Sequence, residues 1–297
     1  MQKSRITHYF FILSLIGAVM LLASACSNKR KSTSSNGKVS IVASTNVYAD
    51  IAKNVAGKYG DVQAVIKNSA TDPHDFEPTT ADAKNLTKAN IIVANGLGYD
   101  SWMNKLASSV NKKTVLVGED LMHLKKGDNP HIWYNLNMPT KYVNYLVKRL
   151  SKLQPKHAAY FKANGKKYLD KIDQVKKLAK SGSKDNKPVF VSEPVFDYAL
   201  EEAGYKIGDK DFEKAVQNGT DPSPKTINKM TKEIEDKKIA FFVNNTQASS
   251  STVKTFVKLA KKNGVPVLSV RETIPNYTTY LDWMKENYQN LANISKR

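Results

Sequence analysis

The sequence predicts an α/β protein with two mainly parallel-sheet lobes bridged by one long rigid helix. Short apolar runs alternate with helical patterns over residues 38–138 and again over residues 185–297. Such strand–helix alternation is typical of parallel sheets covered by helices. Between these regions, over residues 139–184, apolar residues keep a helical period without any strand-like run.

The first region, residues 38–138, contains four short apolar runs that we predict as strands, at residues 39–43, 62–66, 91–94 and 114–117. Helical patterns lie between them at residues 48–55 and 80–88, and Thr80 is placed to cap the second helix. We therefore expect an N-terminal α/β lobe.

The middle region, residues 139–184, is expected to connect the lobes. Apolar side chains keep helical spacing on both sides of Pro155. Proline is tolerated in the first turn of a helix, because its missing N–H has no intrahelical partner there. A helix over residues 155–180 would be about 39 Å long, enough to brace two lobes against each other. Two ordinary surface helices are the alternative that the pattern leaves open.

The third region, residues 185–297, repeats the strand–helix alternation and is expected to form a C-terminal α/β lobe. Its β-rich runs are residues 189–191, 239–243 and 265–270. Helical patterns separate them at residues 223–235 and 251–263.

The N-terminal residues 1–25 have the layout of a signal peptide. Lys3 and Arg5 precede an apolar stretch over residues 9–22, and small residues lead to Cys26, the only cysteine. This junction resembles the lipobox of bacterial lipoproteins, whose cysteine carries the lipid anchor. Residues 26–37 then form a serine-rich, flexible tether. The resemblance implies a bacterial protein held at the outer face of the cell membrane; an ordinary signal peptide or membrane anchor is the alternative.

The composition narrows the choice of partners. The formal net charge is +19, which could indicate a nucleic-acid binder. However, the lysines are scattered along helical faces without interleaved aromatic residues, so we expect no nucleic-acid partner. With a single cysteine the chain cannot form an intrachain disulfide. We expect a monomer.

Four short segments place metal-competent side chains in turns. His74 lies between two prolines, and His131 follows Pro130 and precedes Trp133 by two residues, so that the tryptophan could wall off a site. Glu193 and Glu272 each follow a predicted strand of the C-terminal lobe. Ligands of open α/β sheets bind beyond the carboxyl ends of the strands. Individually, such histidines are more often turn or packing residues and such glutamates more often solvated caps; together they would form a cation site.

Three sequence blocks resemble the solute-binding protein 9 family, the metal-receptor lipoproteins of ATP-driven zinc and manganese importers, which includes streptococcal adhesin-type lipoproteins. They are residues 72–77 (DPHDFE), 129–133 (NPHIW) and 192–198 (SEPVFDY). The resemblance covers the whole mature chain in order and spacing. It implies two α/β lobes joined by a rigid helix, a metal clamped in the interlobe cleft, and delivery to the permease of an ABC transporter.

The resemblance also implies a ligand set. His74 and His131 would bind the metal from the first lobe, and Glu193 and Glu272 from the second. The block that supports Glu272 is short. Zinc-selective members usually have a histidine where Glu193 stands, and many have a loop rich in histidine and acidic residues that this chain lacks.

Imidazole and carboxylate ligands suit manganese, iron or zinc. Two carboxylates make the site harder, which favours Mn²⁺ slightly over Zn²⁺ as the transported ligand. Four protein ligands would leave no open position, whereas catalytic zinc sites keep one, so we expect capture and no enzymatic activity. Two alternatives stay open: a cell-surface metal-dependent hydrolase with Asp75, Glu77 or Asp197 as general base, and an adhesin acting through its surface.

Overall fold

The protein is described by a computed structural model over residues 37–71, 73, 76–179, 186–247 and 250–294. The predicted signal peptide, Cys26 and nearly all of the tether lie outside these residues, as does His74. Within the described ranges, no helix is both long and apolar enough to cross a membrane. The predicted domain boundaries stay predictions.

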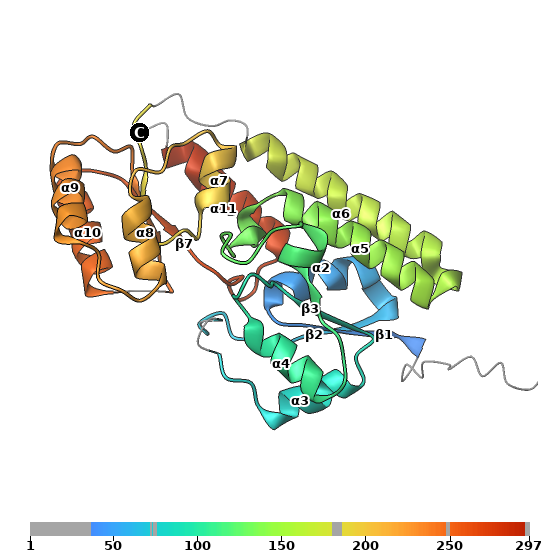
Figure 1. The fold of residues 1–297 in the computed structure, drawn as a ribbon. Coiled ribbons are helices and arrows are strands. Elements are labelled where there is room, and N and C mark those ends of the chain that lie inside the picture. The colour runs from blue at the N-terminus through green and yellow to red at the C-terminus, as the bar shows by residue number, and fades with distance from the viewer. Residues whose placement is uncertain (1–36, 72, 74–75, 180–185, 248–249, 295–297) are drawn as a thin grey trace, which may run out of the picture. The chain divides into compact units, whose positions relative to one another are not determined.

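The first sheet has four parallel strands in the order β2-β1-β3-β4 (Figure 1). These are β1 (Val39–Ala43), β2 (Gly60–Ala64), β3 (Ile91–Ala94) and β4 (Val115–Leu116). All four predicted strands are confirmed, although β2 begins two residues before the predicted run. The difference arises because β2 is only partly buried, so its apolar residues mark its position less sharply than those of β1.

The helices of this first lobe are α2 (Asn46–Ala56), α3 (Thr80–Thr87) and α4 (Ser101–Ser109), with a 3-10 turn, η2 (Gly57–Tyr59), after α2. The predicted cap Thr80 is wrong by one residue. Thr79 has extended backbone geometry and caps α3, and its hydroxyl accepts a hydrogen bond from the N–H of Asp82. Asp82 Oδ2 in turn accepts from the N–H of Thr79, which completes a capping box.

Two long helices, α5 (Asn137–Leu153) and α6 (Ala158–Ala179), run side by side (Figure 1). A 3-10 turn, η5 (Pro155–His157), precedes α6, so the proline lies at the start of the segment as predicted. The 22 residues of α6 span about 33 Å. Besides α5, α6 packs against α2 and against the C-terminal helix α11 (Tyr280–Ile294). The long helix therefore contacts both the N-terminal and the C-terminal part of the chain.

The second sheet has three parallel strands in the order β5-β6-β7. These are β5 (Phe190–Val191), β6 (Phe242–Asn245) and β7 (Val267–Val270), and the other helices are α7 (Asp197–Glu202), α8 (Lys210–Gln217), α9 (Pro224–Glu235) and α10 (Ser251–Lys262). The prediction starts β6 three residues too early, because Ile239 and Phe241 are buried without lying in the strand. Helices α4, α7, α8 and α11 were not predicted.

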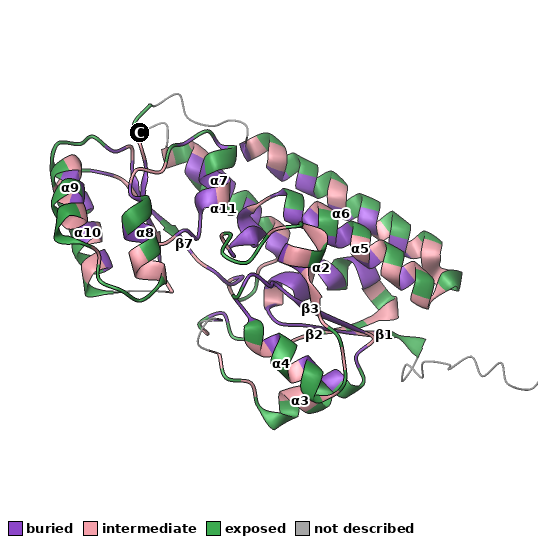
Figure 2. Ribbon diagram, viewed as in Figure 1, coloured by how far each residue is buried: buried purple, intermediate pink, exposed green. Residues whose placement is uncertain are grey.

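Alternate residues of the strands face different cores, as the two-residue period of a strand requires. Ile41 of β1 and Val243 of β6 belong to one large core that includes residues of both sheets. Phe242 faces a separate core with residues of α9 and α10, and Val42 faces another beneath α3 and α4. Figure 2 shows the corresponding buried stripes on α5 and α6. The shared core joins the two sheets independently of any ligand.

Candidate metal site

His131 lies immediately before the 3-10 turn η4 (Ile132–Tyr134), and its side chain is buried. Its Nδ1 is 2.7 Å from Asn129 Oδ1. Asn129 uses its amide N–H to donate to the carbonyl of Pro194 in the second lobe, so its Oδ1 is the acceptor and His131 Nδ1 is the donor. A neutral His131 then carries its lone pair on Nε2, the arrangement that a metal-binding histidine needs.

Aromatic rings enclose His131. Trp133 packs edge-on against the imidazole with ring centroids 5.2 Å apart, and Tyr99 lies at 6.2 Å. The rings of Tyr99 and Trp133 also contact each other, at 4.9 Å. Trp133 therefore lies directly beside the histidine, while its role in walling off a site stays a prediction.

A buried carboxylate supports the loop that carries His131. Asp100 accepts hydrogen bonds from the backbone N–H of Asn95 at 2.7 Å and of Gly96 at 3.0 Å. The Asn95 side chain donates to the carbonyl of Pro130, the residue before His131. Burial raises the pKa of Asp100, while these hydrogen bonds favour its charged form and oppose that shift.

Glu193 occupies the turn that follows β5. The N–H of Ser192 donates to the carbonyl of Val243 on β6, which extends the strand pairing up to the glutamate. The N–H of Val195 then donates to the carbonyl of Glu193 at 2.7 Å, which closes the turn. The side chain of Glu193 is partly buried. The sheet therefore presents this carboxylate at the carboxyl end of β5, as predicted.

Glu272 follows β7 with one residue between, and its side chain is buried. Its backbone N–H donates to Gln247 Oε1 at 2.7 Å. Its carboxylate accepts a hydrogen bond from the hydroxyl of Tyr99 at 3.1 Å. Glu272 thus contacts the first lobe through a residue that also packs against His131.

Asn245 joins the two glutamates. Its amide nitrogen is 2.7 Å from Glu193 Oε2 and 2.7 Å from Glu272 Oε1, and its side chain is buried at the end of β6. Both carboxylates therefore converge on one donor. The sequence analysis did not single out Asn245, although it ends a central strand at the same sheet edge as the two glutamates. Its position at the end of this strand is the one feature of the sequence that could have identified it as a site residue.

His74 lies outside the described residues, but two residues shortly before it, Ser69 and Pro73, accept hydrogen bonds from other parts of the chain. The indole N–H of Trp102 donates to the carbonyl of Pro73 at 3.1 Å. The carbonyl of Ser69 accepts from the Arg271 guanidinium at 2.8 Å and from the hydroxyl of Thr273 at 2.7 Å. The residues that flank Glu272 thus hold the loop that leads to His74.

The described residues contain no group of three or more His, Cys, Asp or Glu side chains placed to hold a metal ion. Glu193 and Glu272 meet around Asn245, and Tyr99 links His131 to Glu272. The four-ligand set, which includes His74, therefore stays a prediction.

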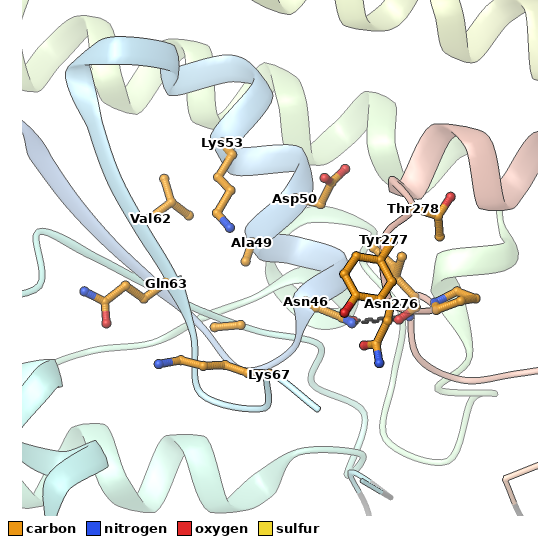
Figure 3. A pocket seen from close by; sticks show the side chains of 13 residues that line it. Asn46, Ala49, Asp50, Lys53, Val62, Gln63, Lys67, Asn276, Tyr277 and Thr278 are labelled. Carbon is orange, nitrogen blue, oxygen red and sulfur yellow. Dashed lines mark hydrogen bonds between the residues drawn. The ribbon is translucent and has the colours of Figure 1, made fainter. Parts of the chain in front are cut away.

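A surface hollow of about 330 Å³ lies between α2, β2 and the segment before α11 (Figure 3). Tyr277 stands at its rim fully exposed, and Asn46, Asp50, Lys53 and Lys67 line it. Its lining does not include His131, Glu193 or Glu272, so this hollow is separate from the candidate metal site.

A family model described as zinc-uptake complex component A, periplasmic, matches residues 41–294 of this chain. The metal ABC transporter substrate-binding lipoprotein SsaB of Streptococcus sanguinis is 26% identical over 305 residues, covering 94% of this chain and 96% of that protein. The manganese ABC transporter substrate-binding lipoprotein PsaA of Streptococcus mitis is 25% identical over 307 residues, covering 95% and 96%.

Among solved structures, the periplasmic zinc binding protein TroA from Treponema pallidum superposes with a TM-score of 0.72. It is 19% identical, and the match covers 88% of this chain and 100% of that chain. This likeness shows a shared fold and confirms the predicted architecture of two parallel sheets with a long helix.

Proposed function

Because this chain belongs to the zinc-uptake complex component A family, we propose that it captures one divalent transition-metal ion between its two sheets and delivers it to an ABC-transporter permease. The family consists of binding components of transport systems, so the hydrolase alternative is set aside. An adhesin role stays a prediction.

The convergence of Glu193 and Glu272 on Asn245 is the observation that carries this proposal. Two carboxylates around one donor form a site that a cation can enter by displacing the amide. Tyr99 places a first-lobe residue on the same carboxylate and beside His131. We propose that His131, Glu193 and Glu272 bind the ion together with His74.

We propose Mn²⁺ as the preferred cargo, with Zn²⁺ as the competing ion. A set with two carboxylates is harder than one with three histidines, and hard ligands suit manganese better. The name of PsaA specifies manganese and that of TroA specifies zinc, so members with this fold include proteins named for either ion. A given set of protein ligands generally binds Zn²⁺ more tightly than Mn²⁺. Selectivity for Mn²⁺ must therefore come from ligand type and geometry.

The likeness to named lipoproteins supports an extracytoplasmic protein anchored by a lipid. We propose Cys26 as the lipidated residue, since it follows the apolar N-terminal stretch after three small residues. The second partner would be the membrane permease of the same importer, which would recognise the metal-loaded arrangement of the lobes.

The test is metal-induced thermal stabilisation of the metal-free protein. Addition of Mn²⁺ should raise the Tm of the wild type, and His74→Ala, His131→Ala, Glu193→Gln and Glu272→Gln should each lose most of that rise. A ligand that binds only the folded state stabilises it by about 2.7 kcal/mol at a concentration of 100 Kd. Competition between Mn²⁺ and Zn²⁺ then ranks the two ions.

Glu201→Gln is a matched control, because this glutamate is exposed on α7 in the same lobe. It should keep the full metal-induced shift. If all four ligand variants keep the shift as well, the proposed site is wrong; if the wild type shows no shift with either ion, the capture function is wrong.

A further inference from the structure

Three buried carboxyl side chains form a cluster in the second lobe that the metal site does not use. Asp197 begins α7, Asp209 precedes α8, and Glu213 lies in the first turn of α8. Their exposed fractions are 6%, 4% and 5%. We call these three residues the carboxyl cluster. Buried carboxyl groups without a cationic partner in contact are costly, so their arrangement needs a physical reason.

Backbone N–H groups satisfy only one member of the carboxyl cluster. Both oxygens of Asp209 accept from the N–H of Val191, at 3.2 and 3.1 Å. The side chains of Asp197 and Glu213 lie within hydrogen-bonding reach of each other. Asp197 Oδ1 and Glu213 Oε2 are buried and receive no hydrogen bond from a donor group of the described residues. Two carboxyl groups can hydrogen-bond to each other only when one of them carries a proton.

The charged groups near this pair do not replace that proton. The positive charge of Lys210, on α8, acts on both acids, but its side chain is 62% exposed to solvent. Its Nζ also forms an ion pair with Glu201 Oε1 at 3.6 Å, and the Glu201 side chain is 55% exposed. Tyr198 is the neighbouring hydroxyl, and burial raises its pKa to about 12, so it stays neutral. Burial raises the pKa of Asp197 to about 7 and that of Glu213 to about 8, and it also raises the pKa of Asp209.

Members of the carboxyl cluster lie before and after the turn that carries Glu193. Asp209 binds the N–H of Val191, two residues before the glutamate. Asp197 starts the helix four residues after it. The position of Glu193 relative to β6 therefore depends on how α7 and α8 are held together at this point.

We propose that Asp197 and Glu213 share one proton at neutral pH and act as positioning residues for the Glu193 turn, so that loss of this proton in mildly alkaline medium weakens metal capture. The part of this inference that concerns metal rests on the proposed function. The shared proton itself does not, since the metal-free protein reports it.

The direction of the pH effect follows from linkage. A carboxyl group with a raised pKa in the folded state binds more protons in that state than in the unfolded chain, so folding stability falls as pH rises. The stabilisation is complete below the ordinary carboxyl range, near pH 4. It is lost as pH rises through the values of about 7 and 8 for the pair.

The test compares the wild type with Asp197→Asn and Glu213→Gln. Each variant replaces one acid by an amide that donates permanently to the remaining carboxylate, so the hydrogen bond persists without a titrating proton. The Tm of the metal-free wild type should fall between pH 6 and pH 8.5, and this fall should be much smaller in both variants. Glu202→Gln removes an exposed acid at the end of α7 that is not among the charges acting on the pair, so it should behave as the wild type does.

Infrared spectroscopy gives a readout that a merely structural role would not move. The wild type at pH 7 should show the carbonyl band of a buried protonated carboxyl group, and this band should be weaker in both variants, which keep the other buried acids Asp100 and Asp209. If the band is absent from the wild type, or if the wild type and both variants share one pH dependence of Tm, the shared proton is disproved. Either variant alone suffices if the other does not fold.

The metal arm is measured with Mn²⁺ alone. Its Kd should rise several-fold in the wild type between pH 7 and pH 8.5 and stay nearly constant in Glu213→Gln, since one coupled proton changes an affinity by at most about tenfold per pH unit. If the Kd for Mn²⁺ depends on pH equally in both proteins, the positioning role is wrong. The infrared band would then still support the shared proton. Absence of Mn²⁺ binding by the wild type at every pH would instead disprove the proposed function.

Discussion

The hydroxyl of Tyr99 donates a hydrogen bond of 3.1 Å to the carboxylate of Glu272, although 173 residues separate the two in sequence. Both side chains are buried. Tyr99 comes from the loop after β3 and Glu272 from the loop after β7, so this bond connects the carboxyl ends of the two sheets. A candidate metal ligand of the second lobe is thereby oriented by the first lobe.

Tyr99→Phe should lower the free energy of unfolding of the metal-free protein by about 1.5–3 kcal/mol, because it removes a donor to a buried charged acceptor. Chemical denaturation at neutral pH measures this change. Tyr277→Phe is the control, since the Tyr277 side chain is fully exposed and its hydroxyl can bond to water. Equal stability of the two variants would contradict the role assigned to the Tyr99 hydroxyl.

Asn245→Ala should destabilise the metal-free protein more than the metal-loaded one. Without the amide, Glu193 and Glu272 approach each other with like charges and no shared donor, which costs about 1–3 kcal/mol. A bound cation neutralises the repulsion between the two carboxylates. The difference in Tm between metal-loaded and metal-free protein should therefore widen. Asn244→Ala, at the neighbouring strand position, should leave that difference unchanged; an unchanged difference in Asn245→Ala itself would be the contrary result.

Gly165→Ala should destabilise the protein although alanine is the better helix former. A methyl group at Gly165 would lie 2.5 Å from Val147 Cγ2, so α5 and α6 would have to separate. Overpacking of this kind typically costs about 1–3 kcal/mol. The double variant Gly165→Ala/Val147→Ala makes room for the methyl group, and thermal unfolding should show partial recovery. A double variant less stable than the sum of the single changes would refute the packing argument.

Thr79→Ala should lower stability by about 1 kcal/mol, because it removes the hydroxyl that caps α3. Thr80→Ala, one residue into the helix, should change stability by only a few tenths of that amount. Denaturant midpoints of the two variants distinguish the cap at Thr79 from the cap at Thr80 that the sequence pattern predicted.

The strands were predictable because each is a short buried run between polar turns. β1 and β3 match their predicted ranges, since nearly all of their residues are buried. β6 was misplaced because Ile239 and Phe241 are as buried as the strand itself, so hydrophobicity alone cannot mark where its pairing begins. Helix α11 was missed although Tyr280, Trp283 and Met284 have clear helical spacing.

The site was predictable only in part. Carboxylates and imidazoles next to prolines and strand ends have recognisable chemistry, and Glu193 and Glu272 are indeed brought together. Asn245 and Tyr99 have no such signal, because an amide or a phenol acquires its role only from what the fold places beside it. The carboxyl cluster is likewise invisible in the sequence, since its members belong to different segments of the chain and meet only in the folded protein.

The carbonyl of Ser69 accepts hydrogen bonds from Arg271, Thr273 and Gln247, three residues around the Glu272 loop. These bonds involve no metal ligand, so they hold the two halves of the molecule together before any ion arrives. Ion entry at the proposed site would then need the rearrangement of a few side chains, while these hydrogen bonds keep the two halves together. In a receptor built this way, the loaded and empty states would differ mainly in the side chains that meet where the two halves come together.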